Sequence, residues 1–142
     1  MLFQLSYGIL LINYIINISE TDNNALFCFL IKVLAIKYDE SVDNFESMFR
    51  YSKNKEVLKN CFILSSDSEL RSFAQNLRNT IHYQEIKPGK KSYSQLGIVQ
   101  IVNIYLANTK TKDFDEFKLM GFRLIEESRK LQDQIQQYFN HE

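Results

Sequence analysis

The sequence predicts an all-α protein, an up-and-down helical bundle with short additional helices. Only 4 Gly and 1 Pro stand among 142 residues, and this scarcity favours long helices over the many turns of a β-sandwich. Hydrophobic residues make up 45% of the chain and recur at spacings of three, four and seven, as in amphipathic helices. The length suits a single domain, 1–142, whose core needs no disulfide or metal.

The first predicted helix, 2–18, is uncharged and rich in Leu and Ile. It is shorter than a membrane span of about 20 residues, it contains Gln, Ser and Asn, and no basic cluster flanks it. We therefore expect a buried core helix, with residues 1–18 as a membrane anchor as the alternative. After a polar stretch, the segment 24–38 is apolar on nearly every side, which predicts a central helix.

Two shorter helices are expected at 39–51 and 53–64, each with apolar residues on one face, although the end of the second is also compatible with a short extended piece. Ser66 and Glu69 then form a capping-box pattern. This pattern predicts a helix over 67–83.

The clearest predicted loop, 85–92, contains the only Pro. Helices are expected after it at 94–107 and 113–139. The last helix carries an apolar seam that predicts packing along the bundle or against a partner. The seam consists of Phe117, Leu124, Leu131, Ile135 and Tyr138.

The charge balance and the cysteines limit which functions are compatible with this sequence. The 17 basic and 17 acidic residues give a formal net charge of zero, so RNA binding would need a local patch or one completed by a second subunit. Cys28 and Cys61 each stand in an apolar run, which is typical of buried free thiols in a reducing cytoplasm. Without a Cys/His cluster or a Gly-rich phosphate loop, we expect neither a metal nor a cofactor.

One candidate active site stands out, the stretch 78–82 with the sequence Arg-Asn-Thr-Ile-His. In the helix predicted at 67–83, an apolar stripe faces the core and a line of polar side chains runs beside it. The stripe is Leu70, Phe73, Ala74, Leu77 and Ile81, and the polar line is Arg71, Gln75, Arg78 and His82. Side chains at such a boundary are partly desolvated and can still face a groove.

The chemistry of this edge suits RNA cleavage without a metal. Arg78 can bind a phosphate and stabilise the negative charge that develops on its oxygens. His82 can polarise the ribose 2′-OH or protonate the leaving 5′-oxygen near neutral pH, and Asn79 can orient either partner. The RNA-binding residues expected around them are Arg71, Gln75, Tyr83, Lys87, Lys90 and Lys91. The structural alternative is that the pair arises by chance and that His82 stabilises a helix C-terminus.

The stretch 77–83, Leu-Arg-Asn-Thr-Ile-His-Tyr, resembles the signature helix of the HEPN superfamily, helical-bundle proteins of conflict systems. The family motif is an Arg, usually followed by a polar residue such as Asn, with a His further along; Arg78, Asn79 and His82 match in type and order. The spacer between Arg78 and His82 holds three residues, whereas that of the family motif holds four to six. The resemblance implies a metal-independent endoribonuclease that acts as a homodimer in toxin–antitoxin or related defence systems.

A second function class stays open. Some members of that superfamily are non-catalytic, and the chain also suits a helical interaction module such as an immunity, antitoxin or adaptor protein. Such a module would bind its partner through the seam of the last helix or through the apolar first helix.

Overall fold

Every element that the structure describes is an α-helix, which confirms the predicted fold class. A computed structural model describes residues 2–19, 23–53, 55–56, 67–80 and 97–140. In chain order the helices are α1 (Leu2–Ser19), α2 (Asn24–Tyr51), α4 (Ser68–Asn79), α5 (Ile98–Thr109) and α6 (Phe114–Asn140). Most of the helix predicted at 53–64 lies outside the described residues.

Helix α2 is continuous, so the prediction of two helices at 24–38 and 39–51 is wrong. The chain passes through Tyr38 and Asp39 without a break, and both side chains are buried. Neither Gly nor Pro occurs in α2, so its backbone offers no reason to stop. Asp39, the first residue of the second predicted helix, instead accepts a hydrogen bond from Arg78 of α4.

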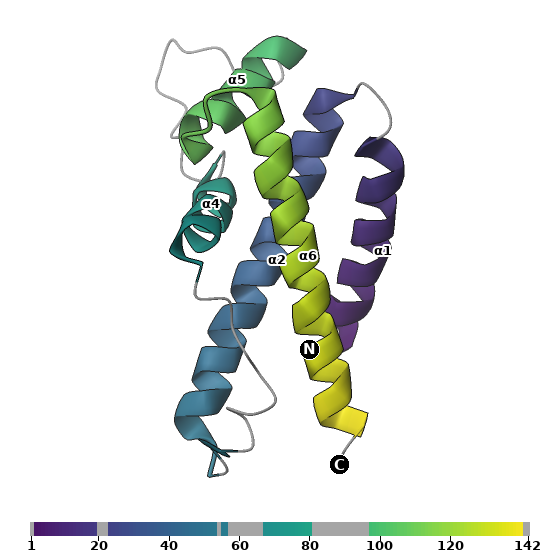
Figure 1. Ribbon diagram of the computed structural model, residues 1–142, viewed down its shortest axis with the longest axis vertical. Helices are drawn as coiled ribbons and strands as arrows, with labels where there is room; N and C mark the ends of the chain where they lie inside the picture. Colours follow the sequence, from purple (N-terminus) through teal and green to yellow (C-terminus); the bar gives the residue numbers. More distant parts are fainter. Residues whose placement is uncertain (1, 20–22, 54, 57–66, 81–96, 141–142) are drawn as a thin grey trace, which may run out of the picture.

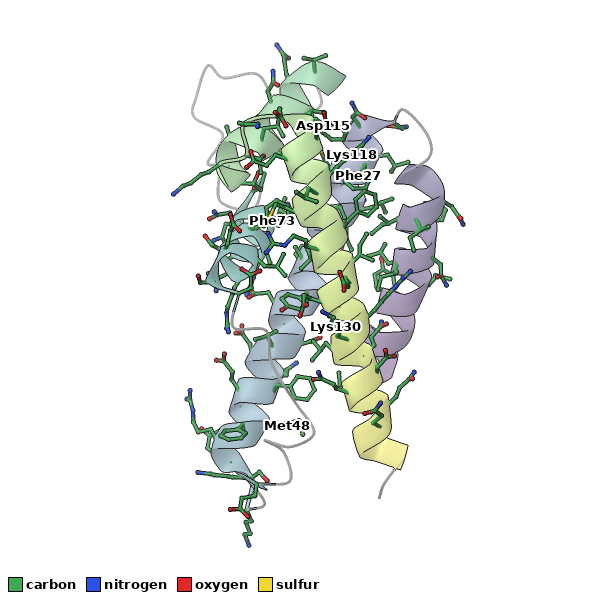
Figure 2. All side chains as sticks on the ribbon, in the orientation of Figure 1. Phe27, Met48, Phe73, Asp115, Lys118 and Lys130 are labelled. Atoms are coloured by element: carbon green, nitrogen blue, oxygen red, sulfur yellow. The ribbon has the colours of Figure 1, made fainter. Side chains whose placement is uncertain are left out.

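The long helices α2 and α6 form the centre of the bundle (Figure 1). Helices α1 and α4 lie on opposite sides of this pair, and α5 lies at one end. Phe117 of α6 is fully buried, and its ring lies 6.4 Å from Phe27 of α2, 5.4 Å from Phe73 of α4 and 6.3 Å from Tyr105 of α5, centroid to centroid. Figure 2 shows Phe27 and Phe73 on either side of α6. This aromatic cluster joins four helices in one core.

The apolar seam of α6 packs inside the chain. Phe117, Leu124, Leu131 and Ile135 are all buried, while the side chain of Tyr138 lies outside the described part. These four residues therefore pack along the bundle, which is the first of the two placements predicted for the seam.

Helix α1 contributes Leu11, Ile12 and Ile15 to the core, as expected of a buried first helix. Of the helices in the described ranges, none combines the length and the apolar content that crossing a bilayer requires.

Candidate active site on helix α4

Asp67 caps the N-terminus of helix α4: its carboxylate accepts hydrogen bonds from the backbone N–H groups of Glu69 and Leu70, each 3.1 Å long. The N-cap is therefore Asp67 and not Ser66, which lies outside the described residues. The bond from the Leu70 amide is the main reason that the pKa of Asp67 lies below its ordinary value. Arg123 of α6 also pairs with Asp67, so the start of α4 is tied to the bundle centre.

The apolar stripe of α4 is buried as predicted: Leu70, Phe73, Ala74 and Leu77 all lie in the core. This burial sets the rotation of the helix and so decides what its other edges face.

The arginine edge of α4 faces α2. Arg78 donates from Nη1 to the Asp39 carboxylate at 2.6 Å, and the same nitrogen lies 3.7 Å from the carboxylate of Asp43. Arg71, two turns earlier, donates to Glu46 at 2.7 Å and lies 3.7 Å from Asp43. The structure thus brings Arg71 and Arg78 together on one edge, as predicted, but sets them against an acidic stripe on α2.

This acidic stripe, Asp39, Asp43 and Glu46, changes the electrostatics of the site. Three carboxylates face two guanidiniums, so the cluster has no excess of positive charge to attract phosphate. The hydrogen bond to Glu46 is the main reason that the pKa of Arg71 is raised. Arg78 differs from Arg71 because its partner is buried: the Asp39 side chain is 5% exposed, while the Arg78 side chain is 43% exposed.

Helix α4 ends at Asn79, four residues before the predicted end at Tyr83, so the predicted continuous helix through Arg78 and His82 is wrong. The C-cap residue Thr80 has extended backbone angles, φ −63° and ψ 128°. Its hydroxyl donates to the Asn76 carbonyl at 2.7 Å, a local bond that competes with helix continuation.

Of the remaining predicted site residues, the structure describes two, which lie one turn apart on α4. Gln75 and Asn79 are exposed, on the side of α4 away from the core. The others lie outside the described residues: Ile81, His82, Tyr83, Lys87, Lys90 and Lys91.

Two buried residues that contact the C-terminal end of α4 were not predicted from the sequence. Asp39 and Lys32 are both buried on α2, and each contacts the end of α4 that carries the motif. A signal for the acidic stripe was present, since Asp39, Asp43 and Glu46 recur at i, i+4 and i+7, but it became useful only once α2 was known to be continuous.

A cavity of about 210 Å³ lies on the opposite edge of α4 from the arginines. Ser72 and Asn76 line it, with Thr109 and Lys110 from the α5–α6 turn, so it is separate from the Arg78 site. Across the described ranges, no three His, Cys, Asp or Glu side chains are grouped so as to hold a metal ion. No protein-family model, curated protein or solved structure matches this chain.

Proposed function

We propose that this chain is a HEPN-like, metal-independent endoribonuclease, a toxin-type subunit of a prokaryotic defence or toxin–antitoxin system that acts as a cytoplasmic homodimer. The observation that supports this proposal best is that the Arg78 side chain is both held in place and accessible to solvent. Its guanidinium is anchored by the buried carboxylate of Asp39 at the end of α4, and nearly half of its side chain is exposed to solvent.

Such an anchor gives Arg78 a fixed direction. A guanidinium carries five N–H donors in one rigid plane, so holding one nitrogen against Asp39 orients the whole group. Donors that are oriented before the reaction stabilise developing phosphate charge without reorganising. Arg71 has no comparable buried anchor, because Glu46 and Asp43 are both substantially exposed.

In the proposed reaction the ribose 2′-oxygen attacks the adjacent phosphorus. The O2′–P bond forms and the P–O5′ bond breaks, which leaves a 2′,3′-cyclic phosphate and a 5′-hydroxyl. The 2′-OH proton passes to a base and O5′ receives a proton; in this proposal the His82 imidazoles of the two subunits carry out these transfers. Arg78 stabilises the charge on the non-bridging oxygens, and Asn79 orients the reacting groups.

The acidic stripe has a consequence for RNA binding. Asp39, Asp43 and Glu46 repel an approaching phosphate. In this proposal the arginine edge therefore stabilises the transition state but adds little to the affinity for RNA. In this proposal the cations that hold RNA are Lys87, Lys90 and Lys91, with stacking on Tyr83 and polar contacts from Gln75. We expect weak RNA binding with a shallow dependence on salt.

The test is cleavage of an RNA oligonucleotide and of the DNA oligonucleotide of the same sequence, each with and without EDTA. We expect the RNA alone to be cut, equally in EDTA, and Arg78→Ala or His82→Ala to slow cleavage by about 100-fold or more. Arg129→Ala, which removes an exposed arginine of α6, is the control and should have no effect. A folded wild-type dimer that leaves every RNA intact, or an Arg78→Ala variant as active as wild type, contradicts the proposal.

A second candidate, the non-catalytic interaction module, is favoured by one observation on α1. Tyr7, Leu10 and Tyr14 lie at i, i+3 and i+7 on one side of the helix and are 41%, 70% and 56% exposed. If this function holds and expression of the chain slows cell growth, that effect survives Arg78→Ala and His82→Ala and is lost in a Leu10→Ser, Tyr14→Ser double variant.

A further inference from the structure

Lys32 of α2 is a buried lysine, 7% exposed, in the core of the bundle. Its ammonium donates a hydrogen bond to the backbone carbonyl of Thr80. In the part of the chain that the structure describes, Lys32 is absent from every ion pair. Burial lowers the pKa of this lysine, because the charged form loses water that one neutral carbonyl only partly replaces.

Thr80, the acceptor, is held at each of its polar groups. Its backbone N–H bonds to the carbonyls of Asn76 and Leu77 at 3.0 and 3.1 Å, and its hydroxyl bonds to Asn76 at 2.7 Å. Its carbonyl takes the bond from Lys32. Thr80 is 2% exposed and has extended backbone angles, so α4 ends at a fixed, buried residue.

Lys32 and Asp39 are seven residues apart on one helix, which places them two turns apart on the same face of α2. Asp39 holds the Arg78 side chain, and Lys32 holds the backbone two residues further along. The two buried charges therefore fix both the side chain that starts the Arg78-to-His82 motif and the main chain in its middle.

We infer that Lys32 is a positioning residue for this motif: its bond to the Thr80 carbonyl holds the end of α4 in place, two residues after Arg78. This inference rests on the proposed ribonuclease function.

The presence of a lysine at this buried position is not explained by a contribution to the stability of the fold. A buried cation opposite a neutral carbonyl costs desolvation energy that an apolar side chain of similar size would avoid. The negative end of the α4 dipole offsets part of that cost. What Lys32 provides is therefore a fixed geometry, because its hydrogen bond attaches the end of α4 to the long helix α2.

The test compares wild type with Lys32→Met, Lys32→Arg and, as the matched control, Lys130→Met, which removes an exposed lysine of α6. On an RNA oligonucleotide we expect Lys32→Met to lower kcat by about tenfold or more with KM nearly unchanged, since the loss of a hydrogen bond from a charged donor, about 1.5 kcal/mol, corresponds to roughly that factor. Lys32→Arg, which still donates to a carbonyl, should restore most of kcat, and Lys130→Met should match wild type. A folded Lys32→Met variant with wild-type kcat overturns the inference.

A second measurement does not depend on cleavage. Amide hydrogen exchange followed by NMR should show the Thr80 N–H exchanging about tenfold faster in Lys32→Met, with core amides such as that of Leu124 unchanged. Unchanged exchange at Thr80 overturns the inference. If Lys32→Met does not fold, Lys32→Leu, whose side chain likewise has no donor, takes its place with the same expected results.

A wild-type chain that cuts no RNA removes the proposed function. The exchange measurement still decides by itself whether Lys32 holds Thr80, so the two failures are distinguishable.

Discussion

Asp39 and Arg78 are 39 positions apart in the sequence, yet the carboxylate of one and the guanidinium of the other are 2.6 Å apart in the fold. Asp39 comes from the middle of α2 and Arg78 from the last turn of α4, so this contact ties the candidate catalytic arginine to the central helix. The burial of Asp39 makes it the stronger of the two carboxylate contacts that Arg78 forms on α2.

The first prediction concerns this pair. Asp39→Asn should lower the free energy of unfolding by about 1–2 kcal/mol, because it replaces a charge-assisted hydrogen bond at a buried position. Asp43→Asn removes an exposed carboxylate 3.7 Å from Arg78 and should change stability by less than about 0.5 kcal/mol. Urea denaturation measures both values, and equal losses would show that burial of Asp39 is unimportant.

The N-cap of α4 should make stability depend on acid pH. The pKa of Asp67 is lower in the folded chain than its ordinary value of 3.8. The Asp67 carboxylate therefore stabilises the fold above pH 3.8, and this stabilisation is lost as the pH falls through the lower, folded pKa. Asp67→Ala should cost about 1 kcal/mol at neutral pH. Asp67→Asn keeps a capping side chain but cannot titrate, so it should lose less at neutral pH and show a flatter profile below about pH 4. Parallel acid profiles for wild type and Asp67→Asn would contradict this account.

Lys32 should make stability depend on alkaline pH in the opposite sense. Its folded pKa lies below the ordinary 10.5, so between the two values the unfolded chain holds a proton that the folded chain has released. The free energy of unfolding of wild type should therefore rise through this window relative to that of Lys32→Met. Urea denaturation at about pH 7.5 and about pH 9.5 measures the difference. The upper pH stays below the raised pKa of Tyr38, and a constant difference would mean that the pKa of Lys32 is not lowered into this range.

The core of α6 offers a matched pair of leucines. Leu124→Ala should lower the free energy of unfolding by about 2–5 kcal/mol, because Leu124 is fully buried and the substitution leaves a cavity. Leu119→Ala, at a position that is 61% exposed on the same helix, should cost less than about 0.5 kcal/mol. Thermal or urea unfolding distinguishes the two, and a large cost at Leu119 would show that its side chain is covered in solution.

Two helical glycines should respond in opposite directions. A Cβ at Gly8 would meet only the Nε2 atom of Gln132, the end of a long side chain that can move, so Gly8→Ala should stabilise the chain by about 0.5 kcal/mol through helix propensity. At Gly121 a Cβ would lie 3.1 Å from Ile31 and 3.3 Å from Phe27, both fully packed. Gly121→Val should therefore destabilise the chain by about 1–3 kcal/mol. Melting temperatures that move in the same direction would refute this contrast.

Much of the fold followed from sequence patterns that are local. The period of three to four residues located α1 and α6 almost to their ends, and it identified the buried stripe of α4. These elements were predictable because the apolar residues of an amphipathic helix lie on the face that it buries, so the sequence of the helix alone identifies that face.

The candidate site depended on contacts between distant residues. Arg71 and Arg78 were expected on one edge of α4, but only the packing of α4 against α2 shows that carboxylates meet them. The end of α4 likewise coincides with a bond from Lys32 to Thr80 across 48 positions.

By itself, then, the sequence determined that the chain is helical and which faces of its helices are apolar, because the spacing of apolar residues within one segment is enough to show both. Only the tertiary structure decided that α2 runs unbroken, that Arg78 is held by Asp39, and that α4 stops before His82. Those outcomes depend on how helices lie against one another, and the free energy of a buried ion pair or hydrogen bond exists only once both partners are brought together.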